Sequence, residues 1–302
     1  MDNEKNSYYH VCSNGNKSKN FLTTREDFLA AFNRIGVCAA NSSASVVAFS
    51  IQDSHFHILL YGTRSECVRF KKMYVLGMTR YIQGCRGALY DIELDCGIYE
   101  ITNASYLKNV AVYVINQPTK DGKRVMPYDY LWGTGCMYFR APGYFSVWRI
   151  DENGTIHEPR AISEMNARQK NQILHTHSKV PDNWLVCNDF LLPDNYLRID
   201  LFEEIYVTHN CYRVFMASNK SKDDAIEDRM VKENGILIET IEARKICTAI
   251  CKRMYNKESS RWLTVDQRLR LAKELRRKYT LSMKQVSTLS RIPEEELRRY
   301  IR

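Results

Sequence analysis

The stretch that most constrains the fold runs from Ser45 to Gly62 (SVVAFSIQDSHFHILLYG), where two apolar runs flank a short polar break. Both runs are rich in the β-branched and aromatic residues that favour strands. Because alternate residues of a strand share a face, His55 and His57 should lie side by side while Phe56 points into the core. Two imidazoles placed in this way can bind one metal ion. The alternative is a pair of half-exposed histidines on an edge strand.

The composition is that of an ordinary globular protein, with 44% hydrophobic and 26% charged residues among 302. This balance excludes intrinsic disorder, and the length allows two or three domains. The polar start MDNEKNSYYH contains no apolar signal region, and no apolar run approaches the roughly 18 residues of a membrane span. We therefore expect a cytosolic protein, associated with the nucleoid if it binds DNA, with no membrane partner.

The net charge of +9 is concentrated at the C-terminus. Residues 258–302 contain twelve lysines and arginines against six acidic residues, so two thirds of the excess lies in this segment. A basic segment on a nearly balanced body indicates a polyanionic partner, most simply nucleic acid. The alternative is a solvated charged surface.

Ten cysteines are scattered singly, without a Cys-x-x-Cys pair. A zinc ribbon or a disulfide scaffold needs tighter grouping, so we expect reduced cysteines that act as small core residues. Cys247 and Cys251 share a helix face but have no further ligands beside them.

The first half of the chain alternates strand and helix patterns. We expect a strand at 8–12, a helix that begins after Thr23 or Thr24, the two strands described above, a helix to about residue 82, and a strand within 88–101. Three basic side chains of the second helix are candidates for contact with DNA: Lys71, Lys72 and Arg80.

The next helix should begin after Thr102 or Asn103 and end near Gln117, because Pro118 disfavours helix in the residue before it. Its apolar stripe comprises Ala104, Leu107, Val110, Ala111 and Val114. Tyr113 and Gln117 lie off this stripe, one turn apart on a single face. The pattern therefore presents a phenol and a carboxamide together at the end of a helix.

Beyond this helix the sequence predicts an ordered Gly-, Pro- and aromatic-rich loop at 120–144, a polar helix at 162–174 and a hinge at 218–224. Helices should follow at 225–256 and 265–278. We divide the chain into a first domain at 1–148, a middle region and linker at 149–224, and a basic helical domain at 225–302.

Residues 264–302 have the pattern of a helix-turn-helix unit. Ser282 should cap a short helix, and Pro293 should occupy the first position of the next one. Three side chains near the end are candidates for contact with phosphates: Arg298, Arg299 and Arg302. Against a direct role in reading bases, three glutamates (294–296) begin the second helix of the unit.

The pair His55 and His57, with Tyr113 and Gln117, makes a coherent chemical set. A divalent ion bound by the two imidazoles and the Gln117 oxygen would keep open positions for a phosphate oxygen. Tyr113, as a nucleophile, would give a phosphotyrosine and a free 3′-hydroxyl. Tyr106, two turns earlier, is the second candidate nucleophile, whereas Tyr128 and Tyr130 are expected to pack.

Several segments, in order, resemble the single-tyrosine HUH transposases, in particular the REP-associated tyrosine transposases of bacteria. They are Tyr9-His10-Val11 with Asn14-Gly15, Ala48-Phe49 followed by His55 to Leu60, Tyr113 to Pro118 with Lys120 and Gly122, and Pro127 to Tyr130 with Trp132.

The resemblance implies an α+β fold with an antiparallel sheet flanked by helices, of the ferredoxin-like kind. It implies Tyr113 as nucleophile, His55, His57 and Gln117 as ligands of Mg²⁺ or Mn²⁺, and single-stranded or hairpin DNA as substrate, in a monomer or a homodimer. The chain departs from the family pattern at Asp53-Ser54 and in the acidic stretch 91–100, and residues after about 149 are not covered.

Other readings remain open at this point. The second His-x-His, at His175 and His177, has no strand-like flanks and is expected in a surface turn. We expect His10, His157 and His209 to stand alone as structural or exposed residues. A non-catalytic DNA-binding or regulatory protein with the same fold is the alternative function, and a replication initiator or relaxase is the nearest enzymatic alternative.

Overall fold

The structure is a computed structural model that describes residues 4–13, 20–87, 94, 96–120, 125–140, 146–217, 226, 240–278, 281 and 283–301. The chain forms two compact units, Met1–Ser218 and Asn219–Arg302. The region expected as a middle segment, 149–217, thus packs within the first unit. Among these described residues, the helices are too short or too polar to cross a membrane.

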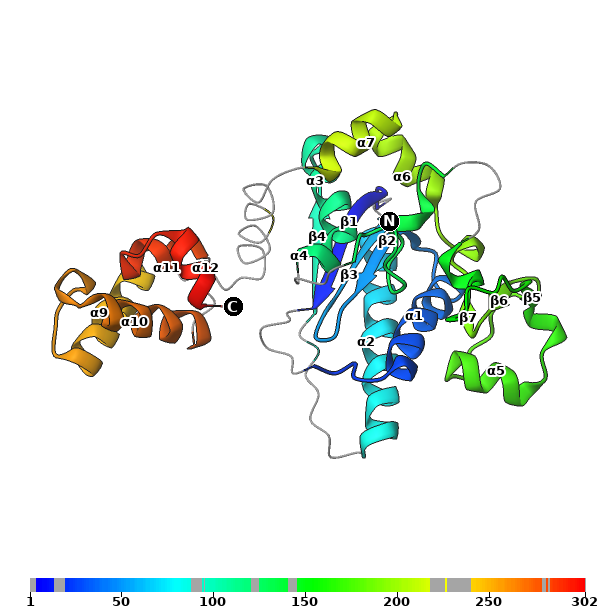
Figure 1. Ribbon diagram of the computed structural model, residues 1–302, viewed down its shortest axis with the longest axis horizontal. Coiled ribbons are helices and arrows are strands. Elements are labelled where there is room, and N and C mark those ends of the chain that lie inside the picture. The colour runs from blue at the N-terminus through cyan, green and yellow to red at the C-terminus, as the bar shows by residue number, and fades with distance from the viewer. Residues whose placement is uncertain are drawn as a thin grey trace. The chain divides into compact units, whose positions relative to one another are not determined.

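A four-stranded antiparallel sheet forms the centre of the first unit (Figure 1). Its strands are β1 (Ser7–Ser13), β2 (Ser45–Ile51), β3 (Phe56–Gly62) and β4 (Cys96–Ile101), in the order β2-β3-β1-β4. The predicted α+β class with an antiparallel sheet is confirmed. Because β1 and β3 are the two inner strands, their backbones are hydrogen-bonded on both sides and hold their side chains firmly.

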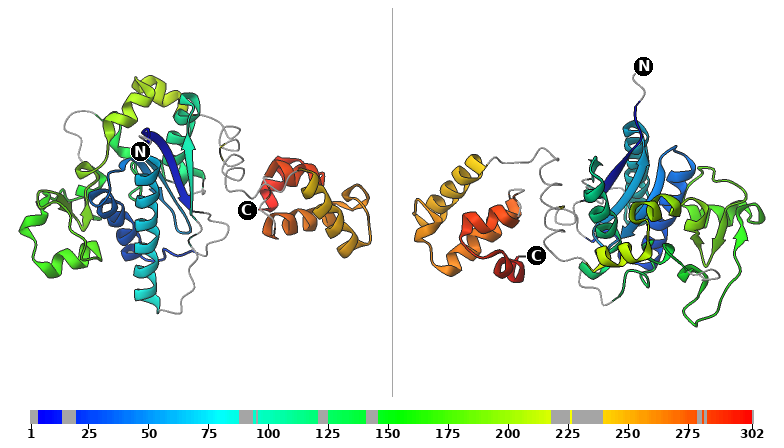
Figure 2. Two further views of the ribbon diagram at one scale, coloured as in Figure 1. Left: turned by 180° about the vertical axis from the view of Figure 1, so that it is seen from behind. Right: turned by 90° about the horizontal axis from the view of Figure 1, so that it is seen from above.

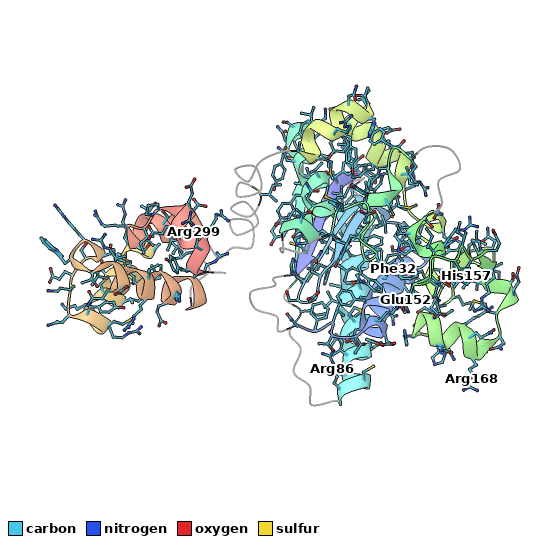
Figure 3. The ribbon with its side chains drawn as sticks, in the orientation of Figure 1. Phe32, Arg86, Glu152, His157, Arg168 and Arg299 are labelled. Carbon is cyan, nitrogen blue, oxygen red and sulfur yellow. The ribbon has the colours of Figure 1, made fainter. Side chains whose placement is uncertain are left out.

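Helices α1 (Arg25–Ala40) and α2 (Arg64–Arg86) cover one face of the sheet. Both begin with a capping box, Thr24 with Asp27 and Thr63 with Glu66, in which side chain and backbone exchange hydrogen bonds. From α1, Phe32 packs edge-on against Phe49 of β2, and from α2, Tyr74 packs against Phe56 of β3. Phe32 is labelled in Figure 3.

Helix α3 (Ala104–Ile115) packs on the opposite face of the sheet and is capped by Asn103. A short helix, α4 (Gln117–Lys120), follows after a break at Asn116, so the main helix ends two residues before the predicted end. In the second half of α3 burial extends beyond the apolar stripe, because residues 110–115 are all buried. The sheet covers one side of α3, and α6 (Ile199–Tyr206) and α7 (His209–Met216) cover the other.

The rest of the first unit packs beside α1 and β2 (Figure 2). It contains a small antiparallel sheet of β5 (Arg160–Ala161), β6 (Leu185–Cys187) and β7 (Phe190–Leu191), which the sequence analysis did not predict. The helix expected at 162–174 is instead a 3₁₀ turn (Ile162–Glu164) and α5 (Ala167–Leu174). Asn166 is the N-cap of α5 and forms a capping box, so α5 begins as a helix separate from the 3₁₀ turn. Further 3₁₀ turns lie at Gly135–Met137, Val147–Arg149 and Pro193–Asn195.

One buried side chain joins this region to α1. The amide nitrogen of Asn33 donates to the carbonyl oxygens of Ile173 and Asp189, and its oxygen accepts from the backbone of Leu191. These three bonds fasten the end of α5 and the β6–β7 hairpin to α1 and provide partners for a buried amide.

The described part of the second unit is helical: α9 (Thr240–Tyr255), a 3₁₀ turn (Ser260–Trp262), α10 (Val265–Lys278), α11 (Met283–Ser290) and α12 (Glu294–Tyr300). Five apolar residues lie in its core, as their spacing in a helix-turn-helix pattern predicts: Val286, Leu289, Ile292, Leu297 and Ile301. Pro293 is the N-cap of α12 and not its first helical residue. The predicted hinge at 218–224, most of 225–239, Ser282 and Arg302 lie outside the described residues.

Candidate active site on the α3 face of the sheet

The two inner strands bring three metal-ligating side chains to one face of the sheet. In the antiparallel register Cys12 lies opposite His57, and His10 lies two residues before Cys12 on the same face. The neighbouring residues Val11 and Ile58 point to the opposite face with α1 and α2. The face beneath α3 therefore carries His10, Cys12 and His57, and one ligand atom of each lies within 4.8 Å of the others.

His10 and His57 form the closest pair of this group. His10 Nε2 lies 3.0 Å from His57 Nδ1, so one ring donates a hydrogen bond to the other. The rings are stacked, with centroids 5.2 Å apart and an interplanar angle of 18°. Only 1% of His10 and 4% of His57 is exposed, which places the pair in the interior. The expectation that His10 stands alone is wrong, because strand pairing brings it against His57.

The phenol of Tyr113 approaches both imidazoles from α3. Its ring centroid lies 5.3 Å from that of His57 and 5.9 Å from that of His10, and both contacts are edge-on. Tyr113 is 4% exposed. The structure therefore brings together a phenol from a helix and two imidazoles from the sheet, as the sequence predicted for His57 and did not predict for His10.

Tyr99 of β4 lies next to His10 on the neighbouring strand. It lies opposite His10 in the strand register, with its ring centroid 6.2 Å from the imidazole. Its ring folds over Gly97, which lies opposite Cys12, and a Cβ at Gly97 would clash with this ring. Glycine at this position therefore allows the Tyr99 ring to lie over the neighbouring strand.

His55 immediately precedes β3, and its ring meets that of His57 at a right angle with centroids 5.2 Å apart. Its Nδ1 also lies 3.2 Å from the Ser54 hydroxyl. Gln117 is buried at the start of α4, and its amide nitrogen donates to the carbonyl oxygen of Tyr113 at 3.1 Å. This bond orients the carboxamide and engages its nitrogen as a donor. The side-chain oxygen is then the atom that can bind a cation.

Two donor sets therefore share His57. Two imidazoles that bind one ion have ring centres about 5 Å apart, given metal–nitrogen bonds of about 2.1 Å. Both His55 with His57 and His10 with His57 have this spacing, at 5.2 Å each. The first set, completed by Gln117, supplies two nitrogens and an oxygen, and the second supplies two nitrogens and a sulfur. The donor types of either set suit a divalent ion, and the ligand atoms of the second set lie within 4.8 Å of one another.

A polar network lies on the β2 side of His57. Ser50 is opposite His57 in the register, and the Gln52 amide donates to the Ser50 hydroxyl. The Tyr130 hydroxyl donates to the carbonyl oxygen of Ile51 at 2.6 Å and also contacts the Gln52 oxygen. Tyr130 thus packs and braces the strand, as expected, whereas Tyr128 is half exposed.

Some of the candidate DNA-contacting side chains are exposed, and others are already bound to groups of the protein. Lys72 and Arg80 of α2 are exposed, whereas the Lys71 amine donates to the carbonyl oxygen of Cys96. In α12, Arg299 is exposed (Figure 3), and Arg298 is paired with Glu294 one turn earlier at 2.6 Å.

The competing histidines and tyrosines lie elsewhere. His175 and His177 are exposed in the turn after α5, which confirms the expected surface turn. His157 pairs with Asp151 at 2.8 Å. Tyr106 lies in the first turn of α3, two turns before Tyr113, whose ring contacts the imidazole of His57.

Sequence reasoning missed His10 and Cys12 as partners of His57. Their signal was present, because they have the same i, i+2 spacing on a strand as His55 and His57. The sequence does not show that β1 and β3 are neighbours, or that their register places Cys12 opposite His57. All ten cysteines are thiols outside any disulfide, and Cys12 is among the buried ones.

Comparison with known proteins gives little further information. No protein-family model matches the chain, and no curated protein matches it. One solved structure that is similar in part is described as "Structure of the REP associates tyrosine transposase bound to a REP hairpin". The match covers 43% of this chain and 77% of that one, at 17% identity and a TM-score of 0.33. A TM-score of this size does not establish a common fold.

Proposed function

We propose that this protein cleaves and rejoins single-stranded or hairpin DNA through a covalent phosphotyrosine on Tyr113, as a metal-assisted transposase. The observation that supports this proposal is the edge-on contact of Tyr113 with His57 and His10 across the α3–sheet interface. The order of motifs that resembles the single-tyrosine HUH transposases supports the same chemistry. The basic second unit supports DNA as the partner.

In the proposed step, Tyr113 Oη attacks the phosphorus of a phosphodiester. The bond between phosphorus and the 3′ oxygen breaks, which leaves a 5′-phosphotyrosine and a 3′-hydroxyl. The proton of Tyr113 passes to the imidazole of His10, and the resulting imidazolium, directly or through water, returns a proton to the departing 3′ oxygen. Because one phosphate ester replaces another, the reverse attack by a 3′-hydroxyl rejoins DNA without ATP.

The protein contributes a fixed nucleophile and bases beside it. Free tyrosine has a pKa of about 10, so a base that accepts its proton is needed near neutral pH. A divalent ion at His55, His57 and Gln117, Mg²⁺ or Mn²⁺ by the family resemblance, supplies charge neutralisation for the phosphate when bound. Because Tyr113 is 4% exposed, the residues that cover it must move before a phosphate reaches its hydroxyl.

That burial favours a second candidate function. A protein that keeps the fold, has no accessible nucleophile and binds DNA through its basic helical unit would serve as a DNA-binding regulator. The two functions differ in one measurable property, the formation of a covalent bond between protein and DNA.

The test uses the full chain with end-labelled hairpin and single-stranded oligonucleotides, in Mg²⁺ or Mn²⁺ and in EDTA. We expect a DNA adduct that survives SDS, depends on the metal and disappears in Tyr113→Phe. Tyr106→Phe is the matched control, since it removes a hydroxyl from the same helix and should keep the adduct. An adduct that persists in Tyr113→Phe would identify another nucleophile, and specific DNA binding without an adduct on any oligonucleotide would support the regulator.

A further inference from the structure

We propose that His10, Cys12 and His57 form a zinc site, distinct in chemistry from the expected His55, His57 and Gln117 set. The inference goes beyond the proposed strand transfer and does not depend on it. It rests on the strand register, the separations of the ligand atoms and the types of donor.

The geometry needs little change to accommodate a tetrahedral ion. With zinc–nitrogen bonds of about 2.1 Å and a zinc–sulfur bond of about 2.3 Å, nitrogens lie about 3.3 Å apart and nitrogen and sulfur about 3.6 Å apart. The His10 and His57 nitrogens are already 3.0 Å apart, and the three ligand atoms lie within 4.8 Å of one another. The separations are close to those required, and both rings must turn so that their facing nitrogens and the Cys12 sulfur point to one centre.

The site is built on the most rigid part of the sheet. His10 and Cys12 come from β1 and His57 from β3, the two strands with neighbours on both sides. All three residues are buried. Ligands that are ordered before binding lose little conformational entropy when the ion arrives, which favours tight binding.

The donor types select the ion. Two imidazoles and a thiolate suit Zn²⁺ and similar transition metals, whereas Mg²⁺ takes oxygen ligands in octahedral geometry. Three protein ligands leave one position of a tetrahedral ion open, as in catalytic zinc sites. One thiolate leaves the site with a net charge of +1, which favours an anion at that open position, on the face that Tyr113 contacts.

The competing explanation is purely structural. In that case the His10–His57 hydrogen bond satisfies two buried polar rings, and Cys12 is a small residue that fills the core between them. The two explanations differ in whether the sulfur of Cys12 ever contacts a metal, which can be observed directly.

The first test is a titration of the metal-free full chain with Co²⁺, a spectroscopic substitute for Zn²⁺. We expect a thiolate-to-cobalt charge-transfer band that saturates at one equivalent and is abolished in Cys12→Ser. Cys96→Ser, on the neighbouring strand, is the matched control and should keep the band. A band of unchanged intensity in Cys12→Ser, or no band in the parent chain, would overturn the proposal.

The second test measures Zn²⁺ affinity by competition with a chromophoric chelator, together with circular dichroism of each metal-free variant to confirm folding. Loss of an outer partner of a metal ligand costs about 10- to 100-fold in affinity, so loss of a ligand itself should cost at least about 100-fold. We expect that loss in His10→Ala and Cys12→Ser, and little change in His55→Ala. Equal weakening in His55→Ala and no weakening in a folded Cys12→Ser would instead assign zinc to the other set.

Discussion

The ring of Tyr113 meets the ring of His57 edge-on, with centroids 5.3 Å apart, although the two residues lie in different elements. His57 in turn lies 3.0 Å from His10 between its Nδ1 and His10 Nε2. The contact is buried between the sheet and α3, so the three rings can move only if α3 or its cover moves. This small cluster is where the proposed nucleophile, base and metal ligands coincide.

His10 should matter for the rate of DNA cleavage if strand transfer occurs here. If His10 is the base that accepts the proton of Tyr113, His10→Gln should slow adduct formation by about 10²- to 10⁴-fold. DNA binding should change little. Single-turnover adduct formation and DNA affinity, measured on the same hairpin, check this. His175→Gln, which changes an exposed imidazole, should leave the rate unchanged. Equal rates for His10→Gln and the parent chain would show that another group takes the proton.

Zinc should compete with the ion that supports cleavage, because both donor sets use His57. Added Zn²⁺ should reduce Mn²⁺-dependent adduct formation in the parent chain and do so much less in Cys12→Ser, which lacks the sulfur ligand. The measurement is the Zn²⁺ concentration that halves the adduct yield in each chain. Identical inhibition curves would mean that zinc acts elsewhere, whatever its affinity for the cluster.

Asn33 should be a major determinant of stability in the first unit. Asn33→Ala removes two donated bonds and one accepted bond and leaves the carbonyl groups of Ile173 and Asp189 and the amide of Leu191 without this partner. We expect a loss of about 2–4 kcal/mol in the free energy of unfolding. Asn41→Ala, whose amide makes two bonds nearer the surface, should cost less than about 1 kcal/mol.

Urea unfolding followed by tryptophan fluorescence measures this difference. The exposed Trp262 lies in the second unit, so a Trp262→Phe background leaves tryptophans only in the first unit. Comparable losses for the two asparagine variants would contradict the assignment.

Asp27 makes the stability of the first unit depend on pH. Burial raises the pKa of its carboxyl, but hydrogen bonds from Thr23 and Thr24 and the charge of Arg86 outweigh burial, so the pKa lies below its usual value. A lowered pKa in the folded state stabilises the fold above the unfolded value of about 3.9, and this contribution disappears as the pH falls through the folded pKa.

We therefore expect Asp27→Asn to cost about 2 kcal/mol in the free energy of unfolding at pH 7 and progressively less below pH 4. Urea unfolding in the Trp262→Phe background at both pH values gives the comparison. A cost that does not depend on pH would show that the charge of Asp27 is not what stabilises the start of α1.

Arg299 and Arg298 should differ in their contribution to DNA binding. Arg299 is exposed on α12, whereas Arg298 is already paired with Glu294. If the second unit binds DNA phosphates, Arg299→Ala should lower the slope of log K against log salt concentration by about 1, and Arg298→Ala by less. Fluorescence anisotropy at several salt concentrations measures the slopes. A larger change in Arg298→Ala would place the phosphate contact on the other side of α12.

The sequence by itself determined most of the secondary structure of the first unit. Local signals were sufficient there: the strand-forming runs around His55 and His57, and the capping residues of α1, α2 and α3. It also predicted that Tyr113 lies near His57, and the two rings are in contact. The core of the last two helices followed from the spacing of their apolar residues.

Only the tertiary structure decided which residues surround His57. Strand order and register are set by pairings between segments distant in sequence, and here β1 lies between β3 and β4 and brings His10 and Cys12 to His57. Helices α6 and α7 likewise cover the side of α3 away from the sheet, so the second half of α3 is buried on all sides. Periodicity reports which face of an element is apolar, whereas contacts between distant elements determine whether a polar face is covered.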